Sequence, residues 1–101
     1  MQELEKYTID IYRLCSVHSV KSLYVFGSVL TEKFNVNSDI DFIVDFHSVV
    51  NLNKYADNYY DFKYSLQNIL HRNIDLLEEK AIKNPYFLEA IKNQRKLVYG
   101  H

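Results

Sequence analysis

The sequence predicts a single α/β domain in which a small mixed β-sheet is flanked by helices. Three observations favour this class: helix-like and strand-like hydrophobic patterns alternate along the chain, the strand-like segments are short, and no linker or repeat interrupts them. With 101 residues and 48% hydrophobic content, the chain is long enough to build one core of its own. We therefore expect one domain that spans residues 1–101.

The N-terminal part of the chain predicts a helix and then a short strand. Over residues 3–18, hydrophobic side chains recur at spacings of three and four, which is typical of one face of an amphipathic helix. These side chains are Leu4, Tyr7, Ile11, Leu14, Cys15 and His18. Residues 22–26 (SLYVF) are β-forming and stop at Gly27. Residues 28–34 can form a helical turn or two, and the polar residues after them predict a loop.

The second predicted strand, residues 40–46 (IDFIVDF), has the clearest alternation in the sequence. Its hydrophobic residues at even positions share one face, and Asp41, Ile43 and Asp45 share the other. Residues 51–70 return to helical spacing, and residues 73–78 predict a third strand. Asn84 and Pro85 are typical of the N-cap and first residue of a last helix, and residues 97–99 can form a closing strand. We expect the first three strands to be neighbours in one sheet.

Residues with chemical potential recur at the ends of these predicted strands. Gly27 and Ser28 follow the first strand; Gly27 permits a sharp turn and a close phosphate, and Ser28 adds a hydroxyl donor beside the N–H groups of a helix start. Asp39 and Asp41 follow after ten more residues, and their carboxylates project to the same side. Together they can bind a magnesium ion whose coordination shell is completed by phosphate oxygens and water. If the third strand pairs with the second, Asp75 adds a carboxylate that can bind a second ion and help deprotonate a hydroxyl.

This combination of residues is specific. Gly-Ser followed at this spacing by Asp-x-Asp arises by chance in on the order of one 100-residue chain in a thousand. The segment LYVFGSVLTEKFNVNSDIDFIVDF resembles the core of the DNA polymerase β-like nucleotidyltransferase superfamily, whose motif is Gly-Ser, ten residues, Asp-x-Asp. The short chain and the aspartate in NIDLL resemble the minimal nucleotidyltransferases (MNT), the antitoxin halves of bacterial HEPN/MNT toxin–antitoxin pairs. The resemblance extends over roughly residues 20–99.

The resemblance implies a function as well as a fold. It implies a magnesium-dependent nucleotidyltransferase that moves a nucleoside monophosphate, typically AMP from ATP, to a hydroxyl. Gly27 and Ser28 would bind the triphosphate, and Asp39, Asp41 and Asp75 would form the catalytic trio that holds two Mg²⁺ ions. In MNT antitoxins the acceptor is a tyrosine of the partner toxin, which implies a HEPN-type toxin as the protein partner.

One departure from the family pattern leaves an alternative open. Many relatives follow Gly-Ser with a basic residue and another glycine, whereas this chain continues with Val29 and Leu30. Lys33 and Arg72 are candidates for the missing cation. The alternative is a module that keeps the fold, has little or no catalytic activity, and neutralises its partner by direct binding.

Composition limits which partners and which cellular location we expect for this protein. A formal net charge of −1, with no basic stripe, argues against direct binding of nucleic acid. The N-terminus lacks a signal-peptide pattern and no hydrophobic run approaches the roughly 20 residues of a membrane span, so we expect a cytoplasmic protein with no membrane contact. The four histidines are scattered, which argues against a zinc site, and Cys15 is expected to be a buried, unreactive thiol.

The predicted helix over residues 51–70 is rich in tyrosine. Tyr55, Tyr59, Tyr60 and Tyr64 recur along it and predict packing at the core and its boundary. The alternative is that Tyr60 and Tyr64 lie on a protein interface, where tyrosine is enriched. Such an interface would serve a partner protein or a homo-oligomer.

Overall fold

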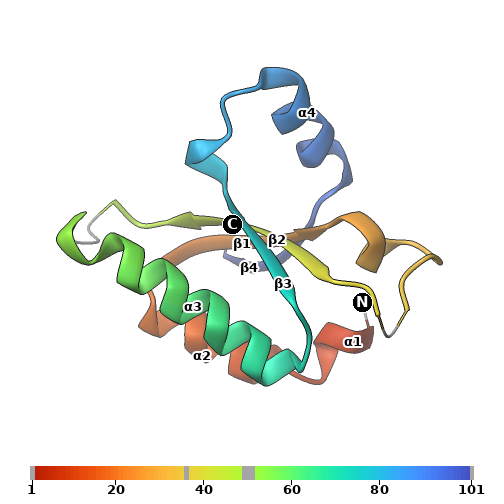
Figure 1. Cartoon of the computed structure of the whole chain (residues 1–101), viewed down its shortest axis with the longest axis horizontal. Coiled ribbons are helices and arrows are strands. Elements are labelled where there is room, and N and C mark those ends of the chain that lie inside the picture. Colours follow the sequence, from red (N-terminus) through yellow and green to blue (C-terminus); the bar gives the residue numbers. More distant parts are fainter. Residues whose placement is uncertain (1, 36, 49–51, 101) are drawn as a thin grey trace.

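A four-stranded mixed sheet, with strand order β3-β2-β1-β4, is the centre of the fold (Figure 1). The structure is a computed structural model and describes residues 2–35, 37–48 and 52–100. Along the chain the elements are α1 (Gln2–Glu5), α2 (Thr8–Val17), β1 (Val20–Phe26), the 3₁₀ helix η1 (Gly27–Leu30), β2 (Ile40–Phe46), η2 (Leu52–Lys54), α3 (Tyr55–Leu70), β3 (Ile74–Glu78), η3 (Glu79–Ala81), α4 (Pro85–Gln94) and β4 (Lys96–Gly100). The predicted α/β class and the adjacency of the first three strands are confirmed.

The directions of the strands bring three segments to one edge of the sheet. Strand β1 is antiparallel to β2, and β2 is parallel to β3. The end of β1 therefore lies beside the starts of β2 and β3. In this register Phe26 pairs with Asp41, and Asp41 pairs with Asp75. The predicted pairing of the third strand with the second, on which the role of Asp75 depended, is confirmed.

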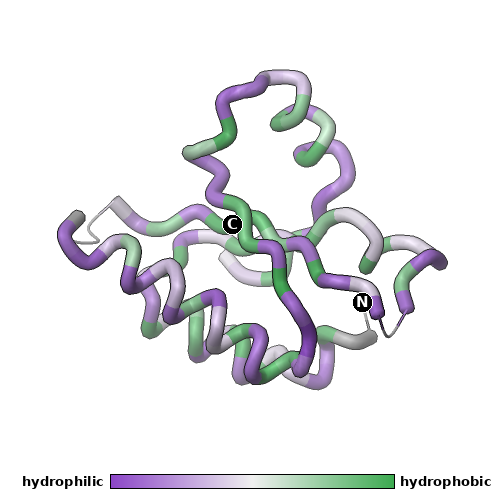
Figure 2. Tube along the Cα trace, viewed as in Figure 1, coloured by the Kyte–Doolittle hydropathy of each residue, from purple (hydrophilic) through white to green (hydrophobic). Residues whose placement is uncertain are grey.

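Helices α2 and α3 cover one face of the sheet and enclose the main core. Alternate residues of β2, among them Phe42 and Val44, pack in one cluster with Ile11 of α2 and with Phe62 and Leu66 of α3. All five side chains are buried. Hydrophilic and hydrophobic segments alternate along both helices, as expected of helices with one buried side (Figure 2). Because this face is filled by the core, the aspartates at odd positions of β2 face the opposite side of the sheet.

Helix α4 lies apart from α2 and α3, at the top of Figure 1, and connects β3 to the edge strand β4. The predicted start of this helix is confirmed: the side chain of Asn84 accepts hydrogen bonds from the N–H groups of Tyr86 and Phe87, and Pro85 is the first helical residue. Ile91 is its buried residue.

The structure corrects some predicted boundaries. The single helix expected over residues 3–18 is divided, because Tyr7 leaves the helical conformation (φ −111°, ψ 12°) and the Thr8 hydroxyl donates to the carbonyl of Glu5. Its predicted hydrophobic face is nonetheless kept, with Ile11 and Cys15 fully buried. The helix expected from residue 51 begins as α3 at Tyr55, and residue 51 lies outside the described residues. Strand β1 begins two residues before the predicted start.

The single cysteine, Cys15, is buried in the core. Burial raises the pKa of its thiol to about 12, which fits the expected unreactive thiol.

The longest described helix, α3, has 16 residues. No helix in the described ranges is both long and apolar enough to cross a membrane.

Candidate active site

Gly27 and Asp41 form the closest contact at the edge where β1 ends. Gly27 adopts a left-handed backbone conformation (φ +78°), which residues with a side chain rarely adopt. A Cβ atom on Gly27 would also collide with the carboxylate of Asp41. The sequence predicted that this glycine makes room for a phosphate. The structure adds that its missing side chain makes room for Asp41, so the two halves of the motif depend on each other.

Asp41 is surrounded by negative charge. Its partner across the parallel ladder is Asp75, whose side chain emerges on the same face of the sheet. The pKa of Asp41 is raised from 3.8 to about 6, first by burial of the carboxyl group, then by the charge of Asp75 and a hydrogen bond with it, and last by the charge of Asp39. Asp75 and Asp39 therefore both disfavour the charged form of Asp41. A bound cation would relieve this repulsion.

Asp39 occupies a different position from the other two carboxylates. It lies one residue before β2, in the loop that follows η1, and its side chain is exposed. Within the described residues, no three carboxylate, imidazole or thiol groups are placed to hold one ion together. Asp39 and Asp41 nevertheless fit magnesium, because this ion takes one or two protein carboxylates and completes its shell with phosphate oxygens and water. The roles of Asp39, Asp41 and Asp75 as magnesium ligands therefore stay predictions.

The turn after Gly27 is shorter than the sequence allowed for. η1 is a single 3₁₀ turn, and the carbonyl of Ser28 accepts hydrogen bonds from both the N–H and the hydroxyl of Thr31. Val29, which follows the Gly-Ser pair, is buried with 5% of its surface exposed. This position therefore contributes to the core and brings no positive charge to the site. Lys33 is exposed just beyond the turn.

Arg72 has a role that the sequence did not reveal. Its guanidinium group donates hydrogen bonds to the carbonyls of Asn35 and Ser38, in the loop that carries Asp39. The same loop and the end of α3 border a pocket of about 440 Å³. The lining residues are Asn37, Ser38, Asp39, Gln67, His71, Arg72 and Asn73. Arg72 is one of the two candidates for the missing cation, and in the structure its guanidinium group contacts the loop. Such a contact between residues 34 and 37 positions apart has no signal in a single sequence.

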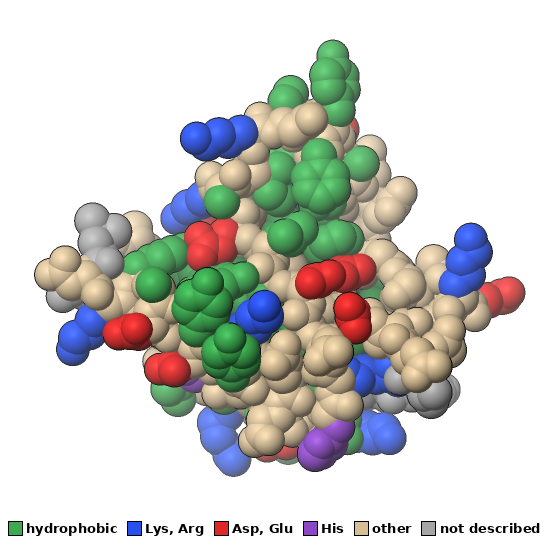
Figure 3. All heavy atoms as spheres, in the orientation of Figure 1, with side chains coloured by type: hydrophobic (Ala, Val, Ile, Leu, Met, Phe, Trp, Pro, Cys, Tyr) green, Lys and Arg blue, Asp and Glu red, His purple; other side chains and the backbone are tan. Residues whose placement is uncertain are grey.

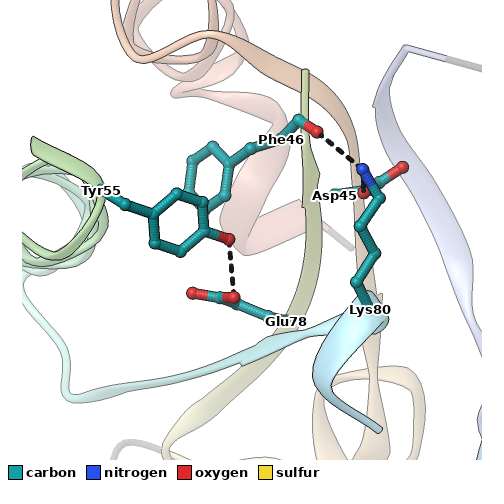
Figure 4. A network of polar contacts seen from close by, with 5 residues as sticks. All are labelled: Asp45, Phe46, Tyr55, Glu78 and Lys80. Atoms are coloured by element: carbon teal, nitrogen blue, oxygen red, sulfur yellow. Dashed lines mark hydrogen bonds and ion pairs between the residues drawn. The ribbon is translucent and has the colours of Figure 1, made fainter. Parts of the chain in front are cut away.

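Asp45 shares a face of β2 with Asp41 but belongs to a separate network at the far end of the strand (Figure 4). Its carboxylate forms an ion pair with Lys80 at 3.3 Å, and Lys80 also donates to the carbonyl of Phe46. Nearby, the hydroxyl of Tyr55 donates to Glu78 at 2.6 Å. This network joins β2, β3, η3 and α3. These contacts make Asp45 a structural residue of the sheet.

Comparison with known proteins identifies the family. The chain matches the nucleotidyltransferase domain family over residues 11–98. It is 32% identical over 84 residues to a protein of Methanocaldococcus jannaschii with the provisional name protein adenylyltransferase MJ1217, covering 81% of this chain and 78% of the relative. A second protein of that organism, provisionally named protein adenylyltransferase MJ0126, is 31% identical over 84 residues with the same coverage.

Solved structures share the fold at lower sequence identity. A structure provisionally described as a minimal nucleotidyltransferase has a TM-score of 0.76 at 23% identity, covering 94% of this chain and 92% of that one. A toxin–antitoxin complex with AMP-PNP gives a TM-score of 0.71 at 20% identity, covering 93% and 73%. The tri-AMPylated HEPN toxin of Shewanella oneidensis in complex with its MNT antitoxin gives 0.67 at 18% identity, covering 100% and 74%.

The family match includes the Gly-Ser turn, both aspartates of the Asp-x-Asp motif and the strand that carries Asp75. It begins in α2 and ends in β4, so that it takes in the whole sheet up to its last strand. This protein therefore belongs to the nucleotidyltransferase family of enzymes and has the fold of a minimal nucleotidyltransferase.

Proposed function

We propose that this protein transfers AMP from magnesium-bound ATP to a tyrosine hydroxyl of a HEPN-type toxin in the cytoplasm, and thereby acts as an antitoxin. The observation that carries the proposal is the convergence of Gly27, Asp41 and Asp75 at one edge of the sheet. The names of the two relatives support transfer of AMP to a protein. The complex of a tri-AMPylated HEPN toxin with an MNT antitoxin supports the choice of acceptor.

In this proposal each residue at the sheet edge has a distinct task. The Gly27-Ser28 turn binds the triphosphate through backbone N–H groups and the Ser28 hydroxyl. Asp39 and Asp41 are the residues that would hold Mg²⁺, and Asp75 would contribute to a second ion. When bound, these ions neutralise charge on the phosphate oxygens and make the α-phosphorus more electrophilic.

The transfer itself is an in-line substitution at phosphorus. The acceptor oxygen forms a bond to the α-phosphorus of ATP while the bond from that phosphorus to the bridging oxygen of the β-phosphate breaks, and pyrophosphate leaves. Asp75 accepts the proton of the acceptor hydroxyl. Its carboxylate lies at the exposed start of β3, where an incoming side chain can reach it.

A protein acceptor suits the surface of so small a domain. Helix α4 carries the exposed aromatic residues Tyr86 and Phe87, at 86% and 47% exposure. In Figure 3 hydrophobic side chains gather on the upper part of the molecule, and acidic side chains lie below them on the same face. Aromatic side chains are enriched at protein interfaces. A partner that covers α4 would bury these aromatic side chains and add recognition surface for the acceptor.

The buried Val29 favours a second candidate, a module that neutralises its partner by binding alone. Without a cation at this position, the turn has less positive charge with which to hold a triphosphate. This candidate predicts that Asp39→Ala/Asp41→Ala protects cells from the partner toxin as well as the unchanged protein does. The first candidate predicts that this variant loses protection.

The experiment that separates the two candidates is the transfer of label from α-labelled ATP. The purified protein is mixed with Mg²⁺ and the HEPN-type protein encoded beside it, if one is present, and label on that protein is measured. We expect labelling by the unchanged protein and none by Asp39→Asn/Asp41→Asn. Asp45→Asn is the matched control, because it removes a carboxylate from the same face of β2 but outside the site. Equal labelling by the double variant would contradict the proposed mechanism.

A further inference from the structure

Arg72 connects the loop before β2 to the start of β3. It lies in the turn between α3 and β3, three residues before Asp75. Its Nη1 atom donates to the carbonyl oxygens of Asn35 and Ser38, both at 2.9 Å. Its guanidinium carbon lies 4.3 Å from the centre of the Phe34 ring, within the range of a cation–π contact. One side chain thus holds three residues of the loop.

Asp39 depends on this loop for its position, whereas Asp41 does not. Asp41 is fixed within β2 by its pairing with Phe26 on one side and Asp75 on the other. Asp39 precedes the strand and directly follows Ser38, one of the two residues whose carbonyls bind Arg72. The placement of the exposed Asp39 carboxylate relative to Asp41 is therefore set by how firmly the loop is held.

Asn35, Asn37 and Ser38 are hydrogen-bonded to one another within the loop. The Ser38 hydroxyl accepts a hydrogen bond from the N–H of Asn35, and the N–H of Ser38 donates back to the carbonyl of Asn35. The side chain of Asn35 accepts from the N–H of Asn37. Arg72 binds the carbonyl of Asn35 that already takes part in this turn. Its contacts therefore attach a preformed turn to the start of β3.

From these contacts we infer that Arg72 is a positioning residue for the metal-binding carboxylates: it holds the loop so that Asp39 and Asp41 face the same cation. This inference rests on the proposed function, because it assumes that these two aspartates bind Mg²⁺. Arginine suits the task better than lysine, because a planar guanidinium can stack on Phe34 while it donates to two carbonyls. Residues that orient metal ligands typically change metal affinity by 10- to 100-fold when they are removed.

The test compares Arg72→Gln and Arg72→Lys with the matched control Arg95→Gln. The guanidinium carbon of Arg95 lies 3.7 Å from the centre of the Tyr24 ring, and its Nη1 atom forms an ion pair with Glu79. Arg95 thus makes the same kinds of contact as Arg72, but with residues outside the loop. Two readouts are used. The first is the dissociation constant of Mn²⁺ in the presence of a non-hydrolysable ATP analogue, from electron paramagnetic resonance. The second is amide hydrogen exchange over residues 35–39 in the metal-free protein.

We expect Arg72→Gln to weaken Mn²⁺ binding by about tenfold and to speed hydrogen exchange in the loop, with Arg72→Lys between it and the unchanged protein. Arg95→Gln should leave both readouts unchanged, even where it lowers the melting temperature. Wild-type Mn²⁺ affinity in a folded Arg72→Gln or Arg72→Lys protein would overturn the inference, as would an equal loss in Arg95→Gln. Failure of the proposed function is a separate outcome, namely Mn²⁺ binding that Asp39→Asn/Asp41→Asn does not weaken.

Discussion

At the scale of single residues, Asp41 is an acidic side chain whose charge the metal-free fold disfavours. Its pKa of about 6 lies above the ordinary value of 3.8. The folded protein therefore binds a proton at Asp41 more tightly than the unfolded chain does. This contribution to the free energy of unfolding is complete below about pH 4 and is lost as the pH rises from 4 to 6.

We predict that Asp41→Asn raises the melting temperature of the metal-free protein at pH 7.5 while it abolishes nucleotidyl transfer. The expected rise is about 3 °C, a small value because Asp41 is partly exposed and solvent screens its charge. At pH 4 the rise should shrink, since Asp41 is then largely neutral in the folded state. Thermal unfolding in EDTA at the two pH values measures this. An equal rise at both would show that the charge of Asp41 is not its source.

Gly27 is constrained by its backbone and by its neighbour, and the two constraints can be separated. Gly27→Ala places a Cβ both in a left-handed conformation and against the Asp41 carboxylate. We predict a loss of stability of about 1 to 3 kcal/mol from the two effects together, and loss of ATP binding.

A double-mutant cycle with Asp41→Ala divides this loss. Removing the Asp41 side chain relieves the collision but leaves the backbone strain, so Gly27→Ala should destabilise the Asp41→Ala background by less. Urea unfolding of the four proteins measures the difference. Equal losses in both backgrounds would place the whole effect in the backbone and contradict the close contact of the two residues.

At the scale of secondary-structure elements, the sequence predicted best where a local pattern determines the outcome. The bounds of β2 follow from alternation over residues 40–46, and the start of α4 follows from Asn84 and Pro85. The interruption of the first helix at Tyr7 was missed, because helical spacing of hydrophobic residues continues across it. The packing of Tyr55 and Tyr59 against the core, with Tyr60 and Tyr64 exposed, fits both readings of the tyrosines.

The start of α4 offers a prediction at this scale. Asn84→Ala removes an acceptor that two backbone N–H groups share, and should lower the free energy of unfolding by about 1 kcal/mol. Asn84→Asp should retain most of the free energy of unfolding, since aspartate also caps helices well. Urea unfolding measures both variants, and Asn93→Ala, near the end of the same helix, is the control. Equal effects of the Asn84 and Asn93 substitutions would contradict the role of the cap.

For the molecule as a whole, chain topology accounts for both the success and the limit of the sequence analysis. One antiparallel and one parallel pairing bring Gly27, Asp41 and Asp75 to the same edge, and alternation along β2 anticipated which face they share. The proximity of Gly27, Asp41 and Asp75 could therefore be predicted from motif spacing and strand pairing. Two features could not be predicted: the close approach of Gly27 to the Asp41 carboxylate, and the contacts of Arg72 with the loop. Both depend on distances between segments that are far apart in the sequence.

The central claim is that the edge carrying Gly27, Asp39 and Asp41 binds a metal-complexed nucleoside triphosphate. The most direct measurement is the anomalous diffraction of Mn²⁺ in crystals grown with a non-hydrolysable ATP analogue. We predict an anomalous peak between the carboxylates of Asp39 and Asp41, with the triphosphate against the Gly27-Ser28 turn. A nucleotide bound elsewhere on the protein, or a fully occupied nucleotide with no metal at these two aspartates, would contradict the claim.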